Sequence, residues 1–142
     1  MNIRWPRLVL LGLITAGITF NAPAADKGDK KVDTRVFELR TYFVLPGRMP
    51  AMHARFKNHT NKLLEKHGMT LIGFWNPEGK DGETKLIYLV AHSSREAADK
   101  NWKAFQDDPD WKAARDASEK DGKIVEKVER IYMTPAEYSA LK

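Results

Sequence analysis

An acid, a base and a phenol alternate along one short segment of the chain. Glu38, Arg40 and Tyr42 occupy every second position of "FELRTYF", a spacing that puts them on one side of a β-strand. Together they supply a charge pair and a hydroxyl donor, which can orient a small polar ligand. The alternative is that Glu38 and Arg40 form a structural ion pair across a subunit interface or simply meet solvent. The spacing leaves both interpretations open.

Two aromatic residues farther along the chain are candidates for the same site. Trp75 and Tyr88 both fall in segments with the composition of β-strands. If their strand faces agree with that of Glu38, Arg40 and Tyr42, they would add aromatic walls to the site.

The histidines do not predict a metal site. Three of the four, His53, His59 and His67, are separated by six and eight positions, whereas two metal ligands on one helix face need a spacing of three or four. The chain has no cysteine, which excludes thiolate catalysis and cysteine zinc sites. His59 is a secondary candidate, as a proton carrier or as an axial haem ligand. The alternative is a partly buried helix histidine with no chemical role.

Other function classes find no support. The sequence contains no glycine-rich nucleotide loop, no serine-hydrolase elbow and no zinc-protease motif. Its formal net charge is +5, but acids and bases are interleaved, so no basic stripe for nucleic acid is predicted.

Hydrophobic periodicity predicts the elements that position these residues. A helix is expected at 48–67. A second helical region is expected to begin at a Ser93 cap with Glu96 as its capping-box partner and to restart at Asp107-Asp108-Pro109, with an acid as the cap. Trp102, Phe105 and Trp111 in this region suit a helix core better than an exposed aromatic platform. A short terminal helix is expected at 134–142. Period-two alternation predicts four strands, at 36–44, 69–76, 84–92 and 123–133.

The order of these elements is β-α-β-β-α-β, which predicts an α+β, ferredoxin-like fold. Such a fold has a four-stranded antiparallel sheet with both helices on one face. We expect the apolar row of the first strand, Phe37, Leu39 and Phe43, to pack under the helices. The row of Glu38, Arg40 and Tyr42 would then lie on the bare second face, which something must cover.

The first residues have the pattern of a secretory signal. Arg4 and Arg7 precede an uncharged apolar run at 8–20, and Ala22-Pro23-Ala24 offers small residues for cleavage. We predict a signal peptide at 1–24, a flexible leader at 25–34 and one domain at 35–142. The chain would then be exported to the periplasm or secreted, with no stable membrane insertion after cleavage. An uncleaved anchor is the alternative, but the run is shorter than the roughly 20 residues that span a bilayer.

Most of the predicted domain resembles the NIPSNAP family. The resemblance is carried by "VFELRTYFVLPGRMPAMHARF", "MTLIGFWNPEG", "NWKAFQDDPDW" and "PAEYSALK", and it runs from about Arg35 to the C-terminus. It implies a dimeric α+β barrel, in which two such sheets meet face to face, and therefore a homodimer. Relatives of this fold include cofactor-free monooxygenases and haem-degrading enzymes, and the family itself is linked to trafficking and mitophagy signalling.

We therefore expect an exported homodimer that binds a small, partly aromatic or amphipathic molecule in or beside the barrel, with neither metal nor cofactor. The alternatives are a cofactor-free monooxygenase or haem-binding enzyme of the same fold, and a protein-interaction module.

Overall fold

The computed structural model describes residues 35–142. The predicted signal peptide and flexible leader lie outside the described residues. Among those described, no helix is long and apolar enough to cross a membrane.

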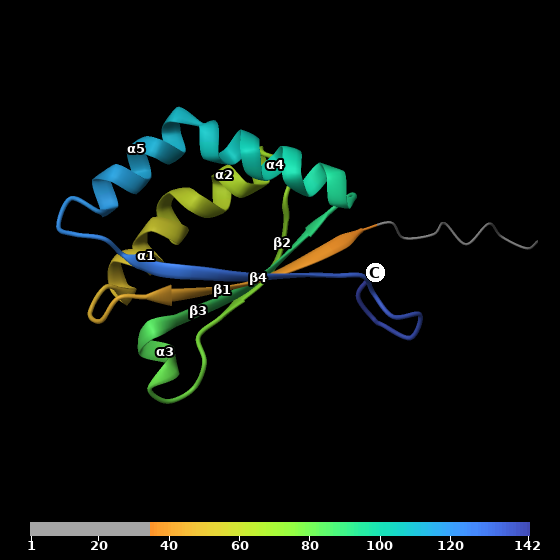
Figure 1. Cartoon of the computed structure of the whole chain (residues 1–142), viewed down its shortest axis with the longest axis horizontal. Coiled ribbons are helices and arrows are strands. Elements are labelled where there is room, and N and C mark those ends of the chain that lie inside the picture. The colour runs from red at the N-terminus through yellow and green to blue at the C-terminus, as the bar shows by residue number, and fades with distance from the viewer. Residues whose placement is uncertain (1–34) are drawn as a thin grey trace, which may run out of the picture. The chain divides into compact units, whose positions relative to one another are not determined.

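The described chain forms one sheet and one layer of helices (Figure 1). Its elements, in chain order, are β1 (Val36–Val44), α1 (Met49–Arg55), the π-helical turn η1 (Phe56–Thr60), α2 (Asn61–Lys66), β2 (Thr70–Trp75), the one-turn helix α3 (Asp81–Thr84), β3 (Lys85–His92), α4 (Arg95–Asp107), α5 (Pro109–Ser118) and β4 (Val125–Met133).

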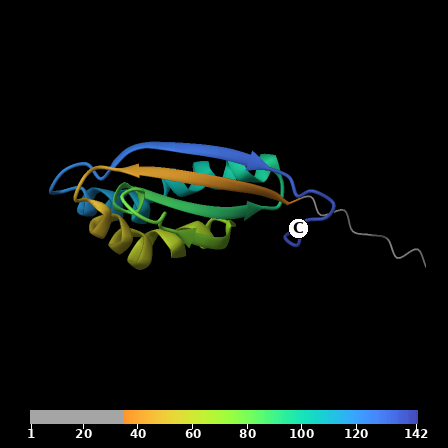
Figure 2. The same ribbon diagram turned by 90° about the horizontal axis from the view of Figure 1, so that it is seen from below.

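The sheet has four strands in the order β2-β3-β1-β4, and every pair of neighbours is antiparallel. The long helices lie on one side of it, which Figure 2 shows from below. This arrangement confirms the predicted ferredoxin-like α+β fold. No helix of residues 35–142 covers the other face of the sheet, which we call the open face.

The helix predicted at 48–67 is present but is interrupted by η1. The backbone N–H of Asn61 donates to the carbonyl of Phe56, five residues back, as π-helical geometry requires. The hydroxyl of Thr60 donates at 3.3 Å to the carbonyl of Arg55, also five residues back. This side-chain bond satisfies an acceptor beside the wider turn and so helps to hold it.

Helices α4 and α5 have side-chain caps. The hydroxyl of Ser94 accepts the N–H of Ala97 at 3.1 Å, so Ser94 is the cap and the prediction of Ser93 was wrong by one residue. Asp108 caps α5 as predicted, accepting the N–H of Asp110 at 2.8 Å.

Asp108 also joins two helices. Its carboxylate accepts hydrogen bonds from Lys66 at 2.8 Å and from His67 at 2.6 Å, both at the end of α2. These hydrogen bonds, that of Lys66 foremost, hold the pKa of Asp108 well below its usual range. The junction of α4 and α5 is thereby fixed to the end of the first helix.

The prediction of which β1 row faces the helices was wrong. Arg40 lies opposite Tyr88 of β3, and residues directly opposite in an antiparallel pair share a face. Tyr88 packs against Phe56 of η1, so the row of Glu38, Arg40 and Tyr42 faces the helices. The apolar row lies on the open face. The reversal is possible because the helix layer and β3 supply partners for the polar groups of the first row, as described below.

The predicted terminal helix is absent. Residues 134–142 form turns and irregular backbone. This segment borders the open face, where it encloses a hollow of about 330 Å³ with Phe37, Leu89 and Met133.

Candidate functional site

A cleft lies between the first helix and the edge of the sheet, close to several of the predicted site residues. It has a volume of about 470 Å³, within the range of small-molecule sites. We call it the edge cleft; its lining comes from α1, η1, α2, β2, β3 and the residue after β2, and comprises His53, Ala54, Phe56, Lys57, Asn61, Phe74, Trp75, Asn76 and Leu86.

Packed aromatic rings form the inner wall of the edge cleft. The ring of Phe56 meets that of Phe74 edge-on, with centroids 5.8 Å apart. Phe74 in turn stacks on Tyr88 at 5.3 Å, and Tyr88 is fully buried. Aromatic rings packed in this way have few rotamers open to them, so the wall is a firm apolar surface.

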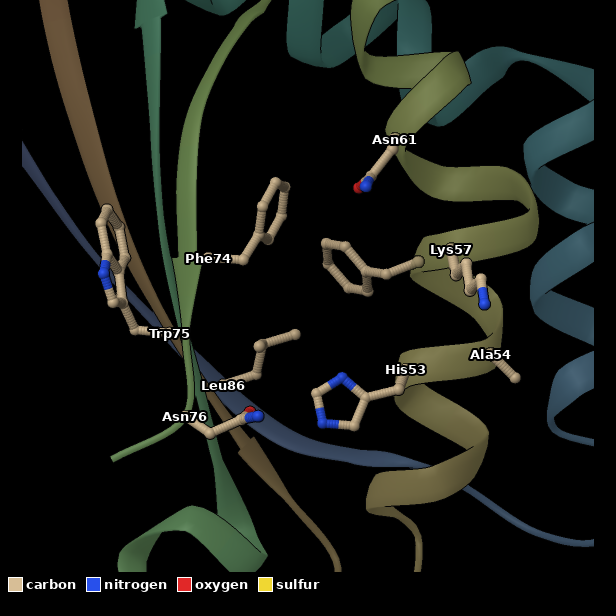
Figure 3. Close-up of a pocket in the computed structure, with 9 residues that line it drawn as sticks. His53, Ala54, Lys57, Asn61, Phe74, Trp75, Asn76 and Leu86 are labelled. Atoms are coloured by element: carbon tan, nitrogen blue, oxygen red, sulfur yellow. The ribbon is translucent and has the colours of Figure 1, made fainter. Parts of the chain in front are cut away.

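Polar side chains reach into the edge cleft from both sides. Figure 3 shows His53 directed from the helix towards Asn76 and Leu86, and Asn61 directed from the next turns towards Phe74. The Oδ1 atom of Asn61 is buried and accepts no hydrogen bond. An unsatisfied buried acceptor is unfavourable, so this amide is suited to a partner that enters the cleft.

Two of the predicted site residues belong to this cleft or its wall. Trp75 lines it, although Figure 3 shows its ring on the side of β2 away from the helix. That ring lies over Gly73, where the Cβ of any larger residue would approach it to 2.7 Å, so only glycine leaves room for it. Tyr88 lies behind the aromatic wall and does not line the cleft.

Tyr42 is linked to the cleft only through its neighbours. Its hydroxyl accepts a hydrogen bond from Tyr88 at 3.3 Å, and its ring meets Phe56 edge-on at 5.8 Å. Burial raises the pKa of the Tyr88 phenol well above its ordinary value of 10.0, so this hydroxyl stays protonated as a donor.

Glu38 and Arg40 form a separate, closed cluster beneath α4. The carboxylate of Glu38 is fully buried and accepts hydrogen bonds from Arg40 at 2.8 Å, His92 at 3.0 Å and the indole N–H of Trp102 at 2.5 Å. The guanidinium of Arg40 lies 3.9 Å from the centre of the Trp102 ring. Each charge is therefore met inside the protein, as a buried ion pair requires.

Burial alone raises the pKa of Glu38, but the hydrogen bonds from His92 and Trp102 and the charge of Arg40 outweigh it. The pKa of Glu38 therefore lies below its ordinary value of 4.5. A carboxylate held ionised by three internal donors is suited to fixing β1, β3 and α4 together.

His59, the secondary candidate, is exposed and does not line the edge cleft. It borders a shallow groove between the first helix and α5, together with Lys62, Asp110 and Ala114. Within residues 35–142, no three potential metal ligands of the His, Cys, Asp or Glu type come together.

The sequence interpretation missed the polar residues of the edge cleft. His53, Lys57 and Asn61 follow one another at intervals of four, which is the signal of a polar row on one side of a helix. That signal was available, but rows of this kind are also ordinary on solvated helix faces. Only the structure shows that two members of this row, His53 and Asn61, point towards β2.

Comparison with known families and structures agrees with the fold. The NIPSNAP family model matches residues 37–140. A NIPSNAP family protein of unknown function from Agrobacterium tumefaciens superposes with a TM-score of 0.67 at 22% identity, covering 78% of this chain and 96% of that one. A NIPSNAP-like domain protein from Burkholderia xenovorans gives a TM-score of 0.65 at 13% identity, covering 75% and 90%.

A more distant structure is SnoaB, a cofactor-independent oxygenase from Streptomyces nogalater. It gives a TM-score of 0.50 at 10% identity and covers 77% of this chain and 99% of that one. At this identity the likeness is one of fold. No curated protein matches the sequence.

Proposed function

This chain belongs to the NIPSNAP family, and we propose that it is a homodimer that binds a small, partly aromatic molecule in the edge cleft. The observation that supports this best is the combination of a firm aromatic wall with the buried Oδ1 atom of Asn61, which has no hydrogen-bond partner within residues 35–142. The site is thus beside the sheet edge. Tyr42 supports the wall of the site through its contacts with Phe56 and Tyr88.

The test is a native mass spectrum of freshly purified protein, which detects co-purified small molecules. A bound species is expected in the wild type. Asn76→Trp should reduce it, because Asn76 is exposed and points into the edge cleft, where a large ring would occupy the space. Asn58→Trp is the matched control, since Asn58 is exposed on the same helix but outside this cleft. Equal occupancy in both variants would place the ligand elsewhere.

The homodimer is supported by the open face of the sheet. Leu39 and Leu89 lie side by side on it, and Ile131 beside them is 58% exposed. Sheets seldom leave such an apolar surface in water, and a second copy related by a two-fold axis would cover it with the same residues.

Cofactor-independent oxygenation is a second candidate. The fold likeness to SnoaB and the position of His53 at the edge cleft favour it, because an imidazole is a suitable general base for an acidic aromatic substrate. Oxygen consumption with electron-rich aromatic compounds, without added metal, is the measurement. A titration with haemin followed in the visible spectrum separates this activity from haem binding.

Export is proposed from the positive, apolar and small-residue order of positions 1–24. N-terminal sequencing of protein from the periplasmic or secreted fraction is expected to give a start near Ala25. A mature chain that still begins at Met1 contradicts the proposal.

A further inference from the structure

The lining of the edge cleft contains a lysine and a histidine but no acid. Lys57 and His53 border it, whereas none of its lining residues is Asp or Glu. Within residues 35–142, neither Lys57 nor His53 forms an ion pair with a carboxylate. Lys85, Arg95 and Lys103, by contrast, each pair with an Asp four positions away. The lining therefore carries the positive charge of Lys57 with no carboxylate to offset it, which favours an anionic ligand.

The π-helical turn aligns the polar groups along the cleft. In a regular α-helix each residue advances by about 100°, so residues eight apart drift by about 80° around the axis. The turn η1 lies between His53 and Asn61 and has more residues per turn than an α-helix. Each of its residues therefore rotates less about the axis, which reduces the angle between His53 and Asn61. His53 and Asn61 consequently both point towards β2, as Figure 3 shows.

The two ends of this row differ chemically. At one end, His53 faces Asn76; Lys57, on the next turn, lines the rim of the cleft, and Figure 3 shows its exposed side chain directed away from β2, so it must change rotamer to meet a ligand beside His53. At the other end, Asn61 carries the Oδ1 acceptor without a partner, and rotation of the amide about χ2 can present this oxygen to the cleft. Between the ends lie Phe56 and Phe74, whose packed rings leave a flat apolar wall.

We propose, building on ligand binding in the edge cleft, that its ligands are flat aromatic carboxylates with a hydrogen-bond donor at the far end. The carboxylate lies against Lys57 and His53. The aromatic body lies on the wall of Phe56 and Phe74. The donor, such as a phenolic hydroxyl, is received by Asn61. Eight helical residues span about 12 Å, so the body is extended and not a single small ring.

The experiment is calorimetric titration of the full protein with 4-hydroxycinnamate, its methyl ester and 4-methoxycinnamate. The ester lacks the charge and the ether lacks the donor, and each is expected to bind about tenfold more weakly, the scale of one charge-assisted or buried hydrogen bond. Added salt should weaken the binding of 4-hydroxycinnamate more than that of its methyl ester, because salt screens the charge contact. Equal affinity for all three compounds overturns this inference while leaving ligand binding intact.

Paired variants assign each contact. Lys57→Gln should weaken the binding of 4-hydroxycinnamate by about threefold to tenfold and leave the binding of its methyl ester unchanged, because an exposed charge contact contributes only modestly to affinity. Lys62→Gln is the matched control, because Lys62 is exposed on the same helix but lines the groove beside α5. Equal effects of the two lysine variants would show a general charge effect and overturn the assignment.

Asn61→Leu keeps the size of the side chain and removes the unpaired acceptor. Thermal unfolding should stay at or above the wild-type temperature, because a buried oxygen without a partner is lost. Binding of 4-hydroxycinnamate should fall towards that of its methyl ether. Unchanged binding overturns the role of Asn61. If no aromatic compound binds and no amide signal of β2 shifts in nuclear magnetic resonance spectra, the proposed function fails together with this inference.

Discussion

At the scale of single residues, the Glu38–Arg40 pair is structural and asymmetric. Glu38 accepts hydrogen bonds from three donors, whereas Arg40 donates to Glu38 and lies over the Trp102 ring. Removal of the acid therefore strands more groups than removal of the base. This asymmetry gives the pair a mutational signature that a surface pair does not have.

The first prediction is a double-mutant cycle. Glu38→Ala should lower the free energy of unfolding by about 3–5 kcal/mol, as for a broken buried pair. Arg40→Ala should lower it by less, because Glu38 keeps His92 and Trp102. The double variant should lose less than the sum, since no stranded charge remains. Urea unfolding at neutral pH is the measurement.

The matched control is the ion pair of Lys103 and Asp107 on α4, whose side chains are 80% and 60% exposed and lie away from the open face. Each single alanine variant of this control pair should change the free energy of unfolding only slightly, and the double variant should show the sum of the two changes. If the Glu38–Arg40 cycle behaves in the same way, the buried cluster is not an energetic unit.

The second prediction concerns pH. The pKa of Glu38 is lowered in the folded protein, so its contribution to stability is complete above the unfolded value near 4.5 and is lost as pH falls through the folded pKa. Urea unfolding between pH 7 and pH 2 should show stability falling below about pH 4.5. Glu38→Gln should flatten that slope. An unchanged slope would mean that Glu38 titrates alike in both states.

The third prediction tests Tyr42. Tyr42→Phe removes the acceptor of the fully buried Tyr88 hydroxyl and should cost about 1–3 kcal/mol. Adding Tyr88→Phe should recover part of this loss, because no unpaired hydroxyl is left. Tyr138→Phe is the control, since Tyr138 is 91% exposed. Thermal unfolding is the measurement. If Tyr42→Phe leaves the stability unchanged, the hydrogen bond between the two hydroxyls does not contribute to folding.

At the scale of elements, the caps and the π-helical turn set how the helices lie on the sheet. Asp108 connects the end of α2 to the start of α5, and Ser94 starts α4 directly after β3. Arg48, before α1, donates to the carbonyl of Gly122 at 2.8 Å and so holds the segment that leads into β4. These contacts fix the helix layer at both ends, which leaves the edge cleft open along one side.

The fourth prediction is at this scale. Ser94→Ala removes the acceptor for the N–H of Ala97 and should lower stability by about 1 kcal/mol. Ser94→Asp should restore it, because a carboxylate also caps and suits a helix N-terminus. Far-ultraviolet circular dichroism during urea unfolding is the measurement. Equal stability of the alanine and aspartate variants would show that Ser94 does not act as a cap.

At the scale of the whole molecule, the open face is the main surface that the fold leaves uncovered. It carries the apolar row of β1, with Leu89 of β3 and Ile131 of β4 beside it. The segment after β4 borders it near Phe37 and Met133. A dimer through this face would join two sheets and leave both edge clefts accessible, since each lies on the helix side.

The fifth prediction tests that assembly. Ile131→Glu should convert a dimer to a monomer, because it places a charge on the open face at a residue that is 58% exposed. Val128→Glu is the control, since Val128 is on the same strand but on the helix side and 37% exposed. Sedimentation equilibrium at micromolar concentration is the measurement. A wild type that is monomeric, or a dimer in both variants, contradicts assembly through this face.

The sequence by itself determined the order of the elements, the fold and the alternation of β1, because periodicity and turn residues are local properties of the chain. Of its two aromatic candidates, Tyr88 lies behind the wall of the edge cleft, whereas the ring of Trp75 lies on the other side of β2. The tertiary structure decided which β1 row lies under the helices. The donors that make this possible, His92 and Trp102, are 54 and 64 positions away from Glu38.

The tertiary structure likewise decided that His53 and Asn61 face a cleft, because a row of polar helix residues becomes a site only when another element lies opposite it. Burial of a charge depends on partners that chain folding brings together, and no local pattern records them.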